Sequence, residues 1–119
     1  MLPGIGDSKI VTIESTEVNG RVVLKLGGRM DAESAKTFEF ACESHVGAGK
    51  PIVVDVGDLV YVSSLGLRSF VTVGKALKDG GGELRLCRMS GFVKQVFEIT
   101  RLSTVFPIFD TIEGAVAGS

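Results

Sequence analysis

Residues 51–70 read PIVVDVGDLVYVSSLGLRSF, and this stretch decides the fold. The segment from Pro51 to Val56 is almost continuously apolar and rich in β-branched residues, which predicts a strand buried on both faces of a sheet. Such a strand is central and parallel to a neighbour. We expect a loop over residues 57–62, followed by a helix that opens at Ser63-Ser64 and runs to about Lys78. The stretch therefore predicts one βα unit of an α/β domain.

Periodicity places the expected helices around this unit. After Asp31, which is a good N-cap residue, one apolar stripe at helical spacing is formed by Ala35, Phe38, Cys42 and Val46. Gly47 and Gly49 are expected to end this helix. The helix after Ser63-Ser64 is expected to turn inward Leu67, Phe70, Val71, Gly74 and Leu77.

The other elements complete the predicted order. Alternating residues predict a strand over Lys9–Glu17, the dipeptide Asn19-Gly20 predicts a tight hairpin turn, and a second strand over Arg21–Leu26 ends at Gly27-Gly28. Towards the C-terminus we expect a strand with Leu84, Leu86 and Cys87, a helix over Gly91–Thr100, a strand over Phe106–Phe109 and a helix over Thr111–Ala117. The sequence thus predicts a single α/β domain over residues 8–117, with a mixed sheet of four or five strands and helices mainly on one face.

Composition excludes several classes of function. The net charge is −1, from 13 basic and 14 acidic residues, so we expect no nucleic-acid binding. No apolar run approaches the roughly 18 residues that a membrane helix needs, and Met1–Asp7 lacks the features of a signal peptide. We therefore expect a cytoplasmic protein. Cys42 and Cys87 are expected to be small buried apolar residues, not a disulfide or metal site.

No catalytic arrangement survives inspection. Ser64 sits at a strand-to-helix turn, but Val62 replaces the first glycine of a G-x-S-x-G motif and the only histidine, His45, precedes the serine. Asp55 ends a buried strand, yet no second acidic cluster accompanies it to hold Mg²⁺; we expect it to bond the following turn. Gly80-Gly81-Gly82 precedes a strand and lacks a following G-K-[ST], so it is no P-loop. We expect no enzyme, cofactor or metal.

Two segments at a fixed separation carry a resemblance to a known family. The first is LGGRMDAESA at residues 26–35, and the second is VDVGDLVYVSSLGLR at residues 54–68. Together with the closing FPIFDTIEGA at residues 106–115, they resemble the STAS domain of bacterial anti-sigma-factor antagonists along essentially the whole chain. Ser63 stands where many phosphorylated members have aspartate, and Leu65 replaces the usual serine or alanine.

The resemblance implies a partner-switching function. The unmodified protein would bind an anti-sigma factor that is also a serine kinase and so release a sigma factor. Phosphorylation would abolish that binding, and a serine phosphatase would restore it. By its place in the motif Ser64 is the expected phosphorylation site, and the matching partner-binding residues are Asp31, Arg29, Met30, Ser63, Leu65, Gly66, Leu67 and Arg68. We expect a monomer or weak dimer.

Two alternatives stay open at this point. Ser64 could serve only as a helix cap, which is the ordinary use of serine at this position. The domain could also be a STAS module that acts as a scaffold or regulatory subunit in a stress-signalling, secretion-regulating or lipid-transport assembly.

Overall fold

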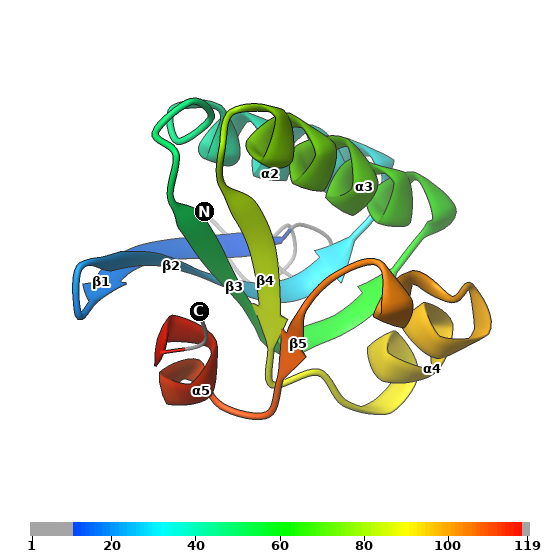
Figure 1. Cartoon of the computed structure of the whole chain (residues 1–119). Helices are drawn as coiled ribbons and strands as arrows, with labels where there is room; N and C mark the ends of the chain where they lie inside the picture. Colours follow the sequence, from blue (N-terminus) through cyan, green and yellow to red (C-terminus); the bar gives the residue numbers. More distant parts are fainter. Residues whose placement is uncertain (1–10, 118–119) are drawn as a thin grey trace, which may run out of the picture.

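The computed structural model describes residues 11–117, so residues 8–10 of the predicted domain lie outside it. Its five strands form one sheet in the order β1-β2-β3-β4-β5 (Figure 1). Only β1 and β2 are antiparallel, and the remaining neighbours are parallel. The expected mixed sheet is therefore confirmed, with strands in sequence order from one edge to the other.

The first hairpin follows the sequence pattern at its turn but not at its end. β1 (Thr12–Val18) and β2 (Arg21–Met30) are joined by Asn19 and Gly20, whose φ values of 51° and 80° are those of a tight hairpin turn. The prediction that Gly27-Gly28 ends β2 is wrong, because the strand continues to Met30. A Cβ at buried Gly27 would lie 2.8 Å from Thr12 Oγ1, so this glycine allows close approach of β1 instead of ending the strand.

β3 (Pro51–Val62) is twice as long as its predicted core, and the loop expected over residues 57–62 is part of the strand. The register against β2 shifts twice, between the pairs of Lys25 and Gly27 and again between Gly28 and Arg29. Such shifts mark β-bulges, which bend a strand and re-aim its side chains. The longer strand brings Tyr61 beside Arg29 and Val62 beside Met30.

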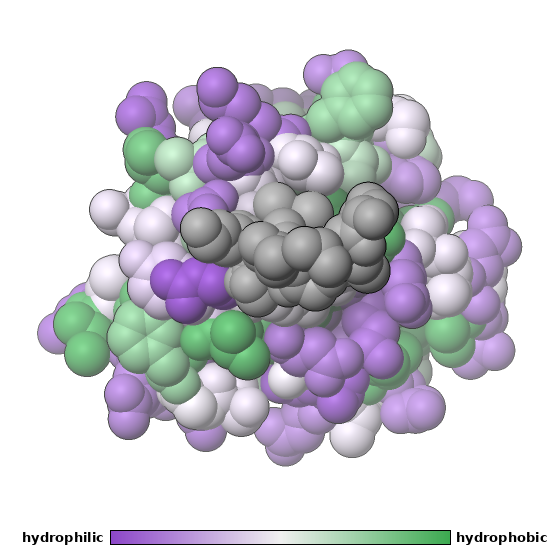
Figure 2. Space-filling view, turned by 180° about the vertical axis from the view of Figure 1, so that it is seen from behind, coloured by the Kyte–Doolittle hydropathy of each residue, from purple (hydrophilic) through white to green (hydrophobic). Residues whose placement is uncertain are grey.

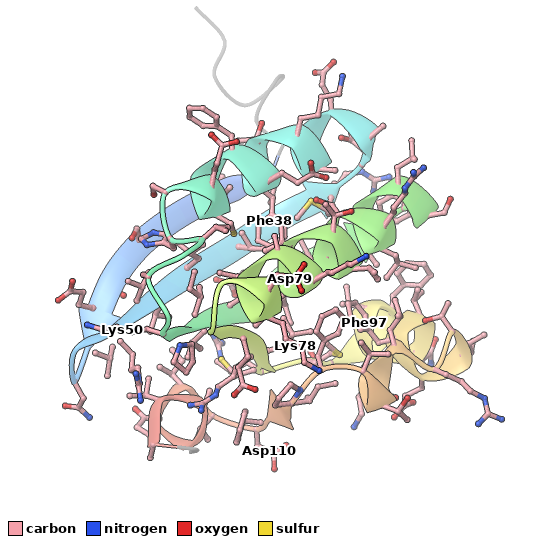
Figure 3. The ribbon with its side chains drawn as sticks, turned by 45° about the horizontal axis from the view of Figure 1, so that its top comes forward. Phe38, Lys50, Lys78, Asp79, Phe97 and Asp110 are labelled. Atoms are coloured by element: carbon pink, nitrogen blue, oxygen red, sulfur yellow. The ribbon has the colours of Figure 1, made fainter. Side chains whose placement is uncertain are left out.

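The two long helices lie side by side over one face of the sheet (Figures 1 and 3). α2 (Ala32–Glu43) ends before Val46, which is exposed, so the predicted stripe is correct only for its first three residues. α3 (Ser64–Asp79) buries Phe70 and Leu77 as expected, with Leu67 half-buried. Val71 was expected to face inward but is exposed, and Val73 takes the buried position.

The C-terminal elements match their predictions within a residue or two. They are β4 (Glu83–Cys87), α4 (Gly91–Ile99), β5 (Ile108–Phe109) and α5 (Ile112–Ala117). The short 3₁₀ helix η1 (Leu102–Thr104) was not expected. On α4, Val93 and Phe97 are buried, whereas Phe92 is exposed.

Two hydrophobic clusters show that the helices lie mainly on one face, as predicted. The larger cluster joins α2, α3 and α4 through aromatic contacts, with ring centroids 4.9 Å apart for Phe38–Phe70 and 5.5 Å apart for Phe70–Phe97. Figure 3 labels Phe38 of α2 and Phe97 of α4. The smaller cluster packs α5 on the opposite face, where it includes Cys87. Burial raises the pKa of the Cys42 thiol to about 12 and that of the Cys87 thiol to about 11, so both cysteines are buried apolar residues as expected.

Among residues 11–117, no helix combines the length and apolar character needed to cross a membrane.

Candidate functional site

The two motifs that were read from the sequence meet at one end of the sheet. Met30 and Val62 are paired at the ends of β2 and β3, and the amide of Ser63 donates to the Met30 carbonyl over 2.8 Å. The next residues along each chain segment open α2 and α3. Both helices therefore begin at the same edge, with their N-termini beside each other.

Gly66 makes this close approach possible. A Cβ built at Gly66 would lie 2.6 Å from the Met30 carbonyl oxygen and 2.6 Å from Met30 Cγ. Such a contact is far inside van der Waals distance, so a side chain here would push α3 away from β2. The glycine in the S-S-L-G stretch thus fixes where the first turn of α3 sits.

Ser63 and Ser64 have different roles at the start of α3. Ser63 has extended backbone geometry, and its Oγ accepts from the amide of Gly66 over 3.1 Å, which makes it the N-cap. Ser64 is the first helical residue; it is exposed, and its hydroxyl has no hydrogen-bond partner among residues 11–117. The cap is therefore complete without Ser64, whose hydroxyl is available to solvent.

Asp31 caps α2 in the same manner. Its Oδ1 accepts from the amide of Ser34 over 2.9 Å, as expected for an N-cap aspartate. This hydrogen bond lowers the pKa of the Asp31 carboxyl, because it stabilises the ionised form. The edge shared by the two helix starts therefore carries a fixed negative charge on the α2 side.

The predicted partner-binding residues divide into exposed and buried groups. Leu65 is 51% exposed, Arg68 is exposed and makes no ion pair among residues 11–117, and Leu67 is half-buried. Met30 and Gly66 are buried. These two residues position the exposed ones.

A stack of aromatic residues and a cation extends this surface. The guanidinium of Arg29 lies 4.2 Å from the centroid of the Tyr61 ring, a cation–π distance. Tyr61 is stacked in turn on Phe92 of α4, with centroids 5.8 Å apart and an interplanar angle of 8°. Beside the stack, Val60 is 65% and Phe92 48% exposed. Figure 2 shows hydrophobic side chains gathered at the lower left of this face, on the side of the molecule where α4 lies.

The sequence pattern does not single out Val60, Tyr61 or Phe92, because it predicts a loop over residues 57–62 and only a helix over Gly91–Thr100. The one available signal was the run Leu59-Val60-Tyr61-Val62, which is too apolar for a solvated loop. We give the name helix-start surface to six exposed residues and two half-buried ones. The exposed residues are Arg29, Val60, Ser64, Leu65, Arg68 and Phe92, and the half-buried ones are Asp31 and Tyr61.

Asp55 is engaged elsewhere in the structure. Its carboxylate is fully buried, accepts from the amide of Gly57 over 2.9 Å, as predicted for the residues that follow it, and pairs with Arg88 Nη1 at 2.8 Å. Arg88 has a φ of 61°, and a Cβ at Gly57 would lie 2.6 Å from its Cζ. Both carboxylate oxygens thus stabilise the bulge in β3 and are not free to accept a phosphoryl group.

The helix-start surface contains no histidine base. His45 follows the C-terminal end of α2, which a helix of 12 residues places roughly 18 Å from the start of α2. Among the described residues there is also no group of three or more His, Cys, Asp or Glu side chains that could hold a metal ion. The arrangement offers a free hydroxyl, two cations and exposed apolar side chains, which suit modification and binding.

Comparison with known proteins agrees with this geometry. The family model described as "STAS domain" matches residues 12–115. BtrV of Bordetella bronchiseptica, provisionally named an anti-sigma factor antagonist, is 34% identical over 102 residues, which cover 85% of this chain and 88% of BtrV.

Two solved structures share the fold. An anti-sigma factor antagonist from Mycobacterium paratuberculosis superimposes with a TM-score of 0.79 at 20% identity, covering 91% of this chain and 92% of the other. The Bacillus cell fate determinant SpoIIAA in its phosphorylated form gives a TM-score of 0.69 at 19% identity, covering 88% and 96%. On the strength of the family match and the relationship to BtrV, the chain belongs to the STAS domain family.

Proposed function

We propose that this chain is an anti-sigma factor antagonist that binds its partner through the helix-start surface and is switched off by phosphorylation of Ser64. The observation that carries the proposal is the division between the two serines: Ser63 caps α3, and the neighbouring Ser64 keeps an exposed hydroxyl without a partner among residues 11–117. A serine needed only as a cap would leave no such hydroxyl. The relatives named as anti-sigma factor antagonists support the proposed partner class.

The start of α3 suits a phosphate. The first amides of a helix have no carbonyl partner within the helix, and the helix dipole favours an anion there. Arg68 lies four residues after Ser64, on the same side of the helix, and its guanidinium is not engaged by an acid among the described residues. The domain would therefore keep its fold when Ser64 carries a phosphate. The solved phosphorylated form of SpoIIAA, which has the same fold, is consistent with this expectation.

The same phosphate would oppose binding. It adds a charge of about −1.5 to −2 next to Leu65, on a surface that also carries the exposed apolar side chains of Val60 and Phe92. A partner that covers these side chains must strip water from the dianion, which costs several kcal/mol unless a cation meets it. The ionised carboxylate of Asp31 at the neighbouring helix start adds to the negative charge. Phosphorylation would thus disfavour the complex without unfolding the protein.

Two enzymes would add and remove the phosphate on Ser64. The anti-sigma factor would itself act as the serine kinase, and a separate serine phosphatase would return the chain to its binding form. In this scheme the chain acts in the cytoplasm as a monomer or weak dimer, has no catalytic function of its own, and frees a sigma factor when it occupies the anti-sigma factor.

Phosphosite mapping tests the residue assignment. The purified chain is incubated with ATP and the kinase-type anti-sigma factors of its own host, and the product is mapped by mass spectrometry. We expect one phosphate on Ser64, complete loss of incorporation in Ser64→Ala, and unchanged incorporation in Thr72→Ala, which alters another exposed hydroxyl of α3. Phosphate on Ser63 or Thr72 would overturn the assignment of Ser64.

A further inference from the structure

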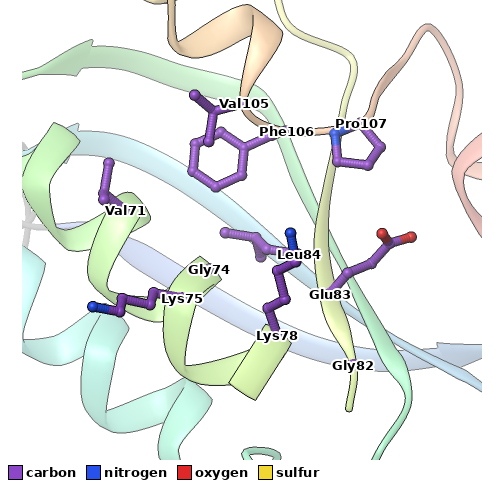
Figure 4. Close-up of a pocket in the computed structure, with 10 residues that line it drawn as sticks. All are labelled: Val71, Gly74, Lys75, Lys78, Gly82, Glu83, Leu84, Val105, Phe106 and Pro107. Carbon is purple, nitrogen blue, oxygen red and sulfur yellow. The ribbon is translucent and has the colours of Figure 1, made fainter. Parts of the chain in front are cut away.

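A groove on the C-terminal half of α3 lies apart from the helix-start surface. It has a volume of about 410 Å³ and runs between α3, the start of β4 and the segment before β5 (Figure 4). None of its lining residues belongs to the helix-start surface. Pockets of roughly 300–1,000 Å³ are typical of small-molecule sites, so the groove is large enough for a small ligand.

Apolar side chains form the floor and rim of the groove. Leu84 and Phe106 are nearly buried at its floor, whereas Val71 and Val105 are 41% and 60% exposed at its edge. Gly74 lets the Phe106 ring pack closely against α3, because a Cβ there would lie 2.7 Å from Cε1 of the ring. The ring therefore rests against bare helix backbone. Covering the exposed apolar rim with an apolar ligand is favourable in free energy, because it removes apolar surface from water.

The charged residues around the groove are arranged unequally. In Figure 4 the side chain of Lys78 extends across the groove towards Leu84, whereas that of Lys75 extends away from it. The carboxylate of Glu83 points away from the groove, and its Oε2 is held by Arg85 Nε at 2.7 Å. Lys78 has no acidic partner among residues 11–117. One ammonium group thus faces an apolar hollow without a counter-ion.

We propose that this groove binds a small amphiphilic carboxylate. The carboxylate pairs with the ammonium of Lys78, and the apolar part of the ligand covers Leu84, Phe106 and Val71. A charge-assisted hydrogen bond orients the ligand, and burial of the apolar rim supplies the remaining affinity. A fully polar anion would leave the rim exposed, and a neutral hydrocarbon would leave Lys78 without a counter-ion, so the groove favours a molecule with both parts.

A titration with sodium decanoate, followed by amide chemical shifts of the ¹⁵N-labelled full chain, tests the proposal. We expect saturable shifts confined to the groove, including Gly74, Leu84 and Val105. Lys78→Met should weaken binding about tenfold. Lys75→Met, which removes the same charge from the same helix, should change it less than about twofold. Decanamide, which has no charge, should bind about tenfold more weakly than decanoate to the unaltered chain.

Several results would overturn the proposal. They are shifts spread over all surface lysines, equal weakening by both lysine variants, equal binding of decanoate and decanamide, or shifts at the groove with a glutamate-rich peptide but not with decanoate. Both lysines are exposed, so the variants are expected to fold. Should Lys78→Met fail to fold, the comparison of decanoate with decanamide on the unaltered chain decides the question. The helix-start surface takes no part in this experiment, so its outcome is independent of the switch at Ser64.

Discussion

Helices α2 and α3 begin beside each other with the same capping chemistry, yet the two starts differ in the serine that remains. At α2, Asp31 accepts from the amide of Ser34, and the Ser34 hydroxyl is buried and accepts from the amide of Val11 over 3.1 Å. At α3, Ser63 accepts from the amide of Gly66, while Ser64 is exposed and free among the described residues. The capping bond is therefore common to both helix starts, and the free hydroxyl of Ser64 is what distinguishes α3 from α2.

The difference arises from what covers the start of each helix. The chain at Val11 passes over the first turn of α2 and seals it, since Val11 is only 6% exposed. The first turn of α3 has no such cover among residues 11–117. It follows directly on β3, near whose end Val60 is exposed and Tyr61 stacks on Phe92.

Replacement of Ser34 and of Ser64 by alanine should show the largest difference in stability between the two helix starts. Ser34→Ala leaves the buried amide of Val11 without an acceptor and should lower the free energy of unfolding by about 1–3 kcal/mol. Ser64→Ala removes a solvated hydroxyl and should change it by less than about 0.5 kcal/mol. Urea denaturation followed by circular dichroism measures both. Equal losses in the two variants would mean that Ser64 is a structural residue like Ser34.

A second pair of variants sharpens the description of the open start. Phe92→Ala removes an exposed ring from the helix-start surface and should weaken binding of the anti-sigma factor by about 1–2 kcal/mol, or roughly tenfold. Ile99→Ala is the matched control, because Ile99 is 81% exposed on the same helix but lies outside that surface. Isothermal titration calorimetry gives both affinities. A larger effect of Ile99→Ala would place the partner elsewhere on α4.

The smallest expected effect is the pH dependence of stability, which should differ between the caps Asp31 and Ser63. The Asp31 carboxyl has a pKa lowered below its ordinary value of 3.8, so its contribution to stability is complete above that pH and is lost as the pH falls through the folded pKa. Asp31→Asn keeps a good cap but has no carboxyl group to titrate. Its free energy of unfolding should therefore fall less between pH 7 and pH 3 than that of the unaltered chain. Ser63→Ala should cost about 1 kcal/mol equally at pH 7 and pH 3. Urea denaturation at both pH values measures these free energies. An equal fall in the unfolding free energy of Asp31→Asn and of the unaltered chain would contradict the prediction.

Local chemistry explains why much of the fold was predictable from the sequence. The turn at Asn19-Gly20, the cap at Asp31 and the helix start after Val62 each depend on a few adjacent residues. The choice between Ser63 and Ser64 as the cap was not predictable, because both have the same side chain and their roles follow from where β3 ends.

The wrong predictions at Gly27 and Gly57 have one cause in common. Glycine usually interrupts a strand, and this rule predicts the end of β2 at Gly27 and the start of a loop at Gly57. Each instead admits a neighbour, Thr12 in one case and the guanidinium of Arg88 in the other. These contacts join residues far apart in sequence, so no local pattern contains them. The same holds for the stack of Arg29, Tyr61 and Phe92, which requires three separate elements to meet.

The affinity of the anti-sigma factor for the chain with phosphoserine placed biosynthetically at position 64 tests the central claim most directly. Calorimetry compares it with the unmodified chain and with a chain that carries phosphoserine at position 72, an exposed site on the same helix. We predict binding at least about 100-fold weaker with phosphate at position 64, and within a few-fold of the unmodified chain with phosphate at position 72. Equal affinities for the unmodified chain and the chain phosphorylated at position 64 would contradict the switch.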